Sequence, residues 1–120
     1  MHQFKELKVW QKGRVLAKDI YKATQKFPKE ELFGISAQMR RAADSIPINV
    51  AGGCGRDSYK ELKRFIGIAN GSAFELETLV IRSVDIKFLS KEDFERFDVE
   101  LTEILKMIFG LKKSRIKSMN

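Results

Sequence analysis

The stretch SYKELKRFIGIANGSAFELETLVIRSVDIK, residues 58–87, predicts the longest helix of the chain. Ser58 is suited to cap the first turn through its hydroxyl, and Glu61 follows three residues later, as in a capping box. Apolar residues then recur every three or four positions, which is the spacing of one buried helix face: Leu62, Ile66, Ala69, Ala73, Leu76, Val80 and Val84. We therefore expect an amphipathic helix over 58–87.

Three further segments carry the same apolar periodicity. The first covers about residues 7–27 and ends before Pro28, because the residue before a proline disfavours helical geometry. The second covers about 35–51, where Pro47 predicts a kink or an early end. The glycines Gly52, Gly53 and Gly55 then predict the turn to the next helix. The last segment covers about 91–112 after a cap at Ser90, and we expect the basic tail, 112–120, to fray.

Four helices with short connections and no strand signal predict an all-α fold. Helices joined in this way pack as antiparallel neighbours at shallow angles around their apolar faces. In the second helix this face comprises Ile35, Met39, Ala42, Ile46 and Val50. The sequence therefore predicts one domain, residues 1–120, folded as an antiparallel up-down-up-down four-helix bundle.

The composition indicates a globular chain with an anionic partner. Its 120 residues are enough to bury a core without disulfides or metal. The formal net charge of +7 favours nucleic acid or an acidic protein surface as partner. Cys54 is the only cysteine, as a reducing compartment permits, and no apolar run has the length of a membrane span or signal peptide. We expect a cytoplasmic protein that does not bind membranes.

The sequence offers no constellation for catalysis or metal binding. A di-metal carboxylate site in a bundle needs two Glu-x-x-His pairs, whereas His2 is the only histidine. Cys54 has no second cysteine or histidine nearby, so we interpret it as a small residue near a turn. The glycines before residue 58 lack the preceding strand and the Gly-Lys-Ser/Thr of a phosphate loop, although Arg56 beside them can meet a phosphate. We expect no enzymatic activity, no cofactor and no small-molecule substrate.

Lysines gather on one side of the first helix, opposite its apolar side. On a helical projection the basic sector contains Lys5, Lys8, Lys12, Lys18, Lys22, Lys26 and Lys29. The apolar sector contains Val9, Trp10, Leu16, Ala17, Ile20, Tyr21, Thr24 and Phe27. No aromatic side chain interleaves with the lysines, so this face offers no stacking platform for bases.

Two interpretations of the basic face stay open: a solvated outer surface, and a surface that contacts phosphates. The candidate nucleic-acid contacts are Lys8, Lys12, Lys22, Lys26, Arg40, Arg41, Arg56, Lys112, Lys113 and Arg115.

Two further sets of residues lie outside the main apolar faces. Gly67, Phe74 and Ile81 recur every seven residues opposite the core face of 58–87, and we predict a subunit interface there. The alternative is that neighbouring helices cover them. A polar set lies beside the apolar face of the second helix and can hydrogen-bond across to the third, which favours a structural network over a ligand site; it comprises Gln38, Ser45, Asn49, Ser72 and Glu75.

The run QMRRAADSIPINVA, residues 38–51, resembles the central signature of a bacterial four-helix-bundle family. This family is named for proteins encoded in intervening sequences of large-subunit ribosomal RNA genes. Three further stretches agree in order and spacing: Phe4-x-x-Leu7-x-Val9-Trp10, Phe27-Pro28 with Glu31 and Phe33-Gly34, and Ala69-x-Gly71-Ser72 with Glu75-Leu76-Glu77-Thr78. One position departs from the pattern, because Gly52 replaces the usual glutamate of the family's Asn-Ile-Ala-Glu-Gly run.

The resemblance implies a ring-like homo-oligomer, a pentamer, with no established enzymatic activity. It links the chain with rRNA intervening sequences by gene location. A similar fold serves as the accessory protein of diversity-generating retroelements, where a basic oligomer engages a reverse transcriptase and nucleic acid. Two functions follow as hypotheses: an oligomer whose basic surface contacts RNA or a ribonucleoprotein, and a structural or protein-interaction module that binds an acidic protein.

Overall fold

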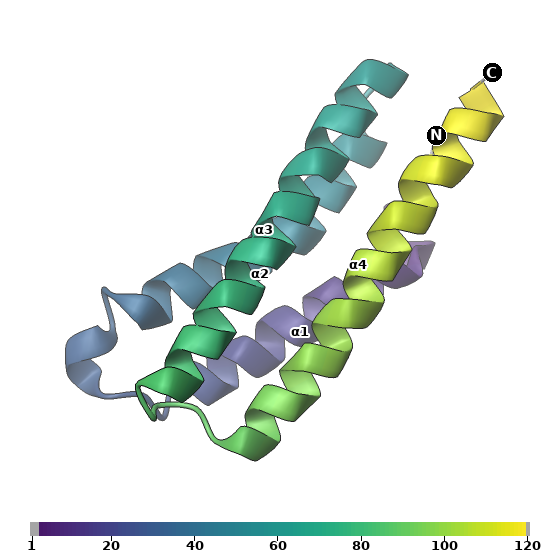
Figure 1. The fold of residues 1–120 in the computed structure, drawn as a ribbon. Helices are drawn as coiled ribbons and strands as arrows, with labels where there is room; N and C mark the ends of the chain where they lie inside the picture. The colour runs from purple at the N-terminus through teal and green to yellow at the C-terminus, as the bar shows by residue number, and fades with distance from the viewer. Residues whose placement is uncertain (1–2, 120) are drawn as a thin grey trace.

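The structure is a computed structural model that describes the backbone of residues 3–119 and the side chains of residues 3–113. Within these residues the chain forms four α-helices: α1 (Lys8–Thr24), α2 (Ile35–Cys54), α3 (Tyr59–Asp85) and α4 (Lys91–Met119). Two short 3-10 helices, Phe4–Glu6 and Lys29–Glu31, lie before α1 and between α1 and α2 (Figure 1). Residues 3–119 contain no strand, which confirms the predicted all-α class. His2 lies outside the described residues.

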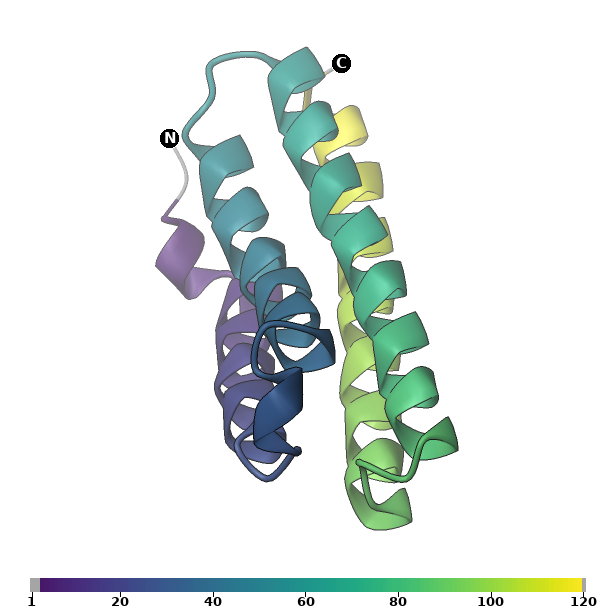
Figure 2. The ribbon, with the colours of Figure 1, turned by 90° about the vertical axis from the view of Figure 1, so that its left-hand side faces the viewer.

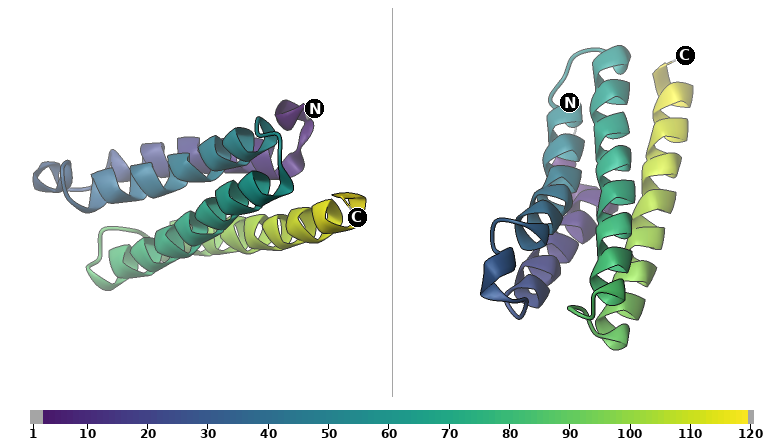
Figure 3. Two further views of the ribbon diagram at one scale, coloured as in Figure 1. Left: turned by 90° about the horizontal axis from the view of Figure 1, so that it is seen from above. Right: turned by 60° about the vertical axis from the view of Figure 1, so that its left-hand side comes forward.

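The helices form an elongated bundle of 49 × 24 × 20 Å. α1 and α3 each pack against α2 and α4, whereas no Cα atoms of the diagonal pairs approach within 8 Å in the described part of the chain. Figure 2 shows the connections at alternating ends of the bundle and both termini at one end, and the views in Figure 3 agree. Each helix therefore buries one side between two neighbours. None of the helices in residues 3–119 has an apolar stretch that could cross a membrane.

The predicted apolar faces form the core. The largest side chains that are almost fully buried come from all four helices and include Leu16, Ile20, Met39, Ile46, Ile66, Leu76, Phe97, Leu101, Ile104 and Ile108. Val84 and Leu111 lie at the edges and are half-buried. Tyr21 is the exception on α1, because its side chain is 51% exposed.

α2 continues through Pro47 to Cys54, so the alternative of an early end at Pro47 is wrong. Pro47 is buried against Gly13 of α1, where an added Cβ would lie 3.3 Å from Pro47 Cδ. The absent side chain of Gly13 lets α1 approach the proline ring closely. This packing favours the helical course of the chain although proline removes one backbone donor.

Gly52 and Gly53 belong to α2, so the predicted turn built from three glycines is also wrong. A Cβ on Gly53 would lie 3.0 Å from Phe65 Cβ, and a Cβ on Gly52 would lie 3.2 Å from the Phe65 ring. These glycines therefore let α3 pack closely on the α2 backbone, and Gly52 accommodates Phe65 where the family pattern has glutamate. Cys54 is buried as the last residue of α2, and Gly55 alone lies at the helix end.

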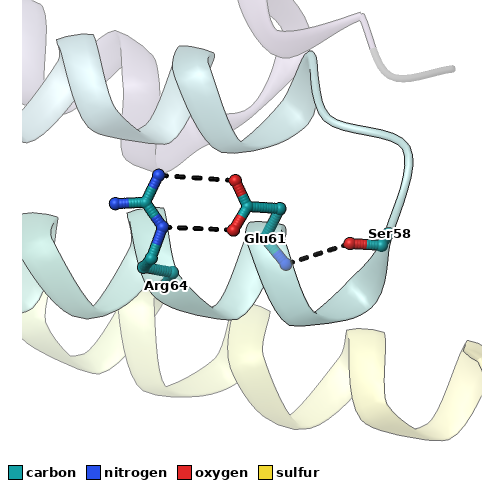
Figure 4. Close-up of polar contacts among 3 residues, drawn as sticks. All are labelled: Ser58, Glu61 and Arg64. Carbon is teal, nitrogen blue, oxygen red and sulfur yellow. Dashed lines mark hydrogen bonds and ion pairs between the residues drawn. The ribbon is translucent and has the colours of Figure 1, made fainter.

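The predicted capping box at the start of α3 forms in one direction only. Ser58 Oγ accepts a hydrogen bond from the Glu61 backbone N–H at 3.2 Å (Figure 4). The Glu61 carboxylate does not return to Ser58. It accepts two hydrogen bonds from Arg64, from Nε at 3.1 Å and from Nη2 at 3.4 Å, and the hydrogen bonds from Arg64 lower the Glu61 pKa. The second expected cap is confirmed, since Ser90 Oγ accepts from the backbone N–H of Asp93 at 3.1 Å.

The helix ends differ from the predicted limits where local hydrogen bonds decide them. α1 ends at Thr24 because Lys26 and Phe27 donate to carbonyls three residues earlier, which tightens the turn before Pro28. α3 ends at Asp85, and Lys87 adopts a left-handed conformation with φ 64°. α4 runs on to Met119, so the expected end at 112 is wrong; no glycine or proline follows Gly110 to interrupt it.

Candidate nucleic-acid interface

α1 carries more than half of the chain's net charge. Its five basic side chains and one acidic side chain give it a formal charge of +4, against +7 for the chain. The predicted contacts Lys8, Lys12 and Lys22 are exposed, and so is Lys26 just beyond the helix. Among the described residues, Lys12 is the only α1 lysine in an ion pair; its Nζ lies 3.0 Å from Glu103 Oε2. The other lysines of α1 can meet an anion without breaking an ion pair.

A groove of about 390 Å³ between α1 and α4 has mixed charge. It is lined by Lys8, Gln11, Lys12, Val15, Glu100 and Glu103. Glu100 Oε2 is buried and receives no hydrogen bond from the described residues. Burial, and then the charge of Asp19, raise the Glu100 pKa, while Arg96 and Lys12 oppose them. The two carboxylates make this groove less suited to phosphate than the outer face of α1.

A second groove, between α1 and α2, combines aromatic and basic side chains. It consists of two hollows of about 500 and 370 Å³ that share Tyr21 as a lining residue. Trp10 lines the first hollow with Arg14 and Lys18, and Arg40 lines the second. The expectation concerned aromatic side chains interleaved with the lysines of the basic sector, and these two rings lie outside that sector. Trp10 and Tyr21 lie at the edge of the apolar sector, where it borders Arg14 and Lys18.

Arg40, a predicted nucleic-acid contact, bridges α2 and α1. Its Nε donates to Thr24 Oγ1 at 2.8 Å, and Thr24 Oγ1 donates to the Ile20 carbonyl at 2.8 Å. The Arg40 Cζ lies 4.1 Å from the centroid of the Tyr21 ring. A guanidinium has five N–H donors, so this arrangement leaves others to line the groove. Arg40 thus positions Tyr21 and keeps positive charge beside it.

The remaining predicted cations do not join one patch. Arg41 is exposed on α2. Arg56 lies at the α2–α3 connection, where its Cζ is 4.7 Å from the Phe65 ring centroid. Lys112 lines a small hollow with Tyr59 of α3, which puts it near the first turn of that helix. The Lys113 Nζ is 6.0 Å from the Phe109 ring centroid, and the Arg115 side chain lies outside the described residues.

The outer stripe of α3 is uncovered. Phe74 and Ile81 are 52% and 47% exposed, so the alternative that neighbouring helices cover them is wrong. Gly67 shares this exposed side, and a Cβ added there would meet no heavy atom within 4 Å. The same holds for Gly71, one turn further on. Gly67 and Gly71 thus leave open space on the outer face of α3, although glycine in a helix interior lowers helix stability relative to alanine.

The predicted polar set forms a smaller network than expected. Ser45 Oγ and Ser72 Oγ lie 2.7 Å apart across the α2–α3 contact, and Asn49 Nδ2 donates to Ser45 Oγ at 2.8 Å. Gln38 and Glu75 are exposed and make no hydrogen bond with this cluster. The hydrogen bond between the two helices gives each serine hydroxyl a partner, which supports the structural interpretation over a ligand site.

Fold and surface together define a class: an all-helical bundle with a basic first helix bordered by two grooves. The chain matches the family of 23S rRNA-intervening sequence proteins over residues 5–110, and it belongs to that family. The resemblance found in residues 38–51 is thereby confirmed.

A solved structure agrees with the fold. The chain is similar to a protein of unknown function from the S23 ribosomal protein family of Bacteroides thetaiotaomicron VPI-5482, with a TM-score of 0.81. The two are 24% identical, and the match covers 88% of this chain and 95% of the other. At that identity the likeness supports the fold alone. A search of curated proteins returned no significant match.

Apart from Arg40, sequence reasoning missed the residues of the α1–α2 groove. Trp10, Arg14, Lys18 and Tyr21 fall within about 80° on a helical projection, so the signal was present in the spacing. The periodicity assigned both aromatics to the core, because a large apolar residue beside a buried face is usually buried too. Only the packing of α2 against α1 reveals that the two rings border a groove.

Proposed function

We propose that this protein binds RNA through the exposed basic side chains of α1, which are Lys8, Lys12, Arg14, Lys18 and Lys22. The observation that carries the proposal is the uneven distribution of charge: α1 holds +4 of the chain's +7, and only one of its lysines is paired with a carboxylate among the described residues. Cations arranged along one helix supply the phosphate contacts on which most nucleic-acid affinity depends. The family name refers to intervening sequences of 23S rRNA, which makes RNA the first anion to test. No catalytic step is part of the proposal.

Filter binding to a structured RNA across a salt series tests this function. Affinity should fall steeply as salt rises, because binding releases condensed counterions from the phosphates. No detectable binding at low salt would contradict the proposal. A pull-down before and after nuclease treatment separates the rival function, since an acidic protein partner that survives nuclease favours an interaction module. The likeness to retroelement accessory proteins stays a prediction.

We also propose that copies of the antiparallel bundle associate through the outer stripe of α3, in a closed ring. The support is the pair of half-exposed side chains, Phe74 and Ile81, beside two glycines that leave room for a close neighbour. The pentamer remains an implication of the family resemblance. Assembly would also repeat the basic α1 around the ring, and repeated sites raise the avidity for a long RNA.

The substitution Phe74→Glu tests the stripe. The variant should run as a monomer of about 13.8 kDa in light scattering, with unchanged helix content, while the wild type has a higher mass. Phe109→Glu is a matched control, because Phe109 is 68% exposed on α4 and outside the stripe. An unchanged mass for Phe74→Glu would refute this interface.

A further inference from the structure

The α1–α2 groove carries a more specific inference, which rests on the proposed RNA binding. We infer that this groove binds single-stranded RNA by stacking unpaired bases against Trp10 and Tyr21, while the flanking cations contact its phosphates. Charge alone does not predict this preference, because phosphate contacts serve duplex and single strand alike. The aromatic side chains in the groove favour single-stranded RNA over a duplex, because only unpaired bases are free to stack on them.

The two rings are held beside positive charge. The Tyr21 side chain is 51% exposed and has the Arg40 Cζ 4.1 Å from its ring centroid. Trp10 packs edge-on to Phe4, with ring centroids 5.3 Å apart, and the Arg14 Cζ lies 5.7 Å from its centroid. Aromatic rings and guanidinium planes are the surfaces on which proteins stack unpaired RNA bases. Trp10 therefore lies in the first hollow and Tyr21 lies where the two hollows meet, each ring with a guanidinium over it. A base can stack on the guanidinium plane or on the exposed part of the ring.

Charge favours RNA over other occupants. The two hollows, of about 500 and 370 Å³, are open to solvent. Their lining includes four basic residues, Arg14, Lys18, Lys29 and Arg40, against one acidic residue, Asp44. This excess complements a chain that carries one phosphate per nucleotide.

The shape of the groove disfavours an acidic amphipathic helix. Such a helix needs an uninterrupted groove for anchors at every third or fourth residue. Here the Arg40 side chain reaches across the second hollow to Thr24 and the Tyr21 ring, so the groove is interrupted there. Trp10 and Tyr21 are separated by about 16 Å along α1 at 1.5 Å per residue. A flexible strand of several nucleotides can place one base in each hollow, whereas a duplex keeps its bases stacked inside.

Trp10 is the only tryptophan of the chain, so its fluorescence reports on the groove directly. The probes are an oligouridylate of about 16 nucleotides and an RNA hairpin with the same number of phosphates, closed by a short loop so that few of its bases are unpaired. The oligouridylate should quench Trp10 emission on binding, whereas the hairpin should bind without quenching.

Variants of Tyr21 provide the second readout. Tyr21→Ala should weaken oligouridylate binding by about 5- to 150-fold and leave hairpin binding within about twofold, because stacking on a single ring is lost. Tyr21→Phe keeps the ring and should bind like the wild type. Phe109→Ala is the matched control, since it removes an exposed aromatic with a nearby lysine on α4, away from the residues that line the α1–α2 groove. Circular dichroism confirms that each variant folds.

The outcomes separate this inference from the proposed function. Equal affinity for both RNAs without a change in Trp10 emission would overturn the stacking site and leave RNA binding intact. No binding of either RNA at low salt would overturn both. A fall in assembled mass of Tyr21→Ala parallel to its loss of affinity would assign the groove to a contact between copies, and would also overturn the inference. The inference would also be overturned if an acidic peptide quenched Trp10 emission and RNA did not displace that peptide from the groove.

Discussion

The α2–α3 and α1–α4 contacts of the bundle are built differently. Between α2 and α3, glycines bring the backbones together at Gly53 and Phe65, and the serine hydroxyls of Ser45 and Ser72 bond to each other. Between α1 and α4 lies an open groove of about 390 Å³ that contains the Lys12–Glu103 ion pair. The buried Oε2 of Glu100, also in this groove, has no hydrogen-bond partner in the described part of the chain. The first contact is close-packed, and the second is open and lined by charged side chains.

This difference places the contacts that stabilise the fold and the proposed RNA-binding surface in different parts of the bundle. The buried contacts that hold the fold concentrate where α2 meets α3. The basic α1 is held mainly through α2, by the Gly13–Pro47 approach and the Arg40–Thr24 hydrogen bond. Its other flank faces the α1–α4 groove, which leaves the outer lysines at the surface. A helix with few buried neighbours on its outer side can carry concentrated positive charge without a large cost to the core.

The largest expected effect comes from the close-packed side. Leu76 of α3 is fully buried, so Leu76→Ala should lower the free energy of unfolding by about 2–5 kcal/mol through lost burial and a cavity. Urea denaturation followed by circular dichroism measures it. Val99→Ala is the control, because Val99 is 58% exposed on α4 and should change stability by less than about 0.5 kcal/mol. Similar losses for both variants would mean that the α2–α3 side is not the main source of stability.

A smaller effect tests the close approach of the backbones. Gly53→Ala puts a Cβ 3.0 Å from Phe65 Cβ and 3.1 Å from Leu62 Cδ1. We expect a net loss of about 1–2 kcal/mol, since overpacking outweighs the better helix propensity of alanine. Gly110→Ala meets no atom within 4 Å and should stabilise α4 by up to about 1 kcal/mol. Stabilisation by both substitutions in the same urea titration would show that the α2–α3 contact accommodates an added methyl group at residue 53 without overpacking.

The smallest stability effect belongs to the α1–α4 groove. Burial raises the Glu100 pKa, so the folded state binds more protons than the unfolded state once pH exceeds the unfolded pKa. Stability therefore falls as pH rises through the window between the two pKa values. Glu100→Gln removes this loss and should raise the melting temperature near neutral pH, with no difference from wild type below about pH 4.

Differential scanning fluorimetry across pH checks this expectation. Glu95→Gln is the control, because Glu95 is exposed on the same helix. A lower melting temperature for Glu100→Gln at neutral pH would show that the Glu100 carboxylate is stabilised by its neighbours.

Sequence periodicity predicted the core well and the glycines poorly. The apolar faces that contain Ile46 of α2, Leu76 of α3 and Leu101 of α4 are buried as expected, because helical spacing alone determines which side of an amphipathic helix is apolar. Whether Gly52 and Gly53 end a helix or continue it depends on what lies opposite. That neighbour, Phe65, comes from another helix and is not encoded in the local pattern.

The candidate site was predicted only in part, again because contacts between helices are not encoded in the local pattern. The exposed lysines of α1 followed from their separation from the apolar residues, and so did the open stripe at Phe74 and Ile81. The role of Arg40 did not, because its hydrogen bond to Thr24 joins two helices. Tyr21 was assigned to the core, but it is 51% exposed and lines the α1–α2 groove.

The salt dependence of RNA binding tests the central proposal most directly. We would measure oligouridylate affinity against salt for the wild type, for Lys18→Gln with Lys22→Gln on α1, and for a matched pair, Lys91→Gln with Lys106→Gln, on α4. If α1 is the RNA-binding helix, the α1 pair should lose affinity and its logarithmic salt slope should shrink by about 0.7 per lost phosphate contact, whereas the α4 pair should resemble the wild type. Identical slopes and affinities for all three proteins would contradict the proposal.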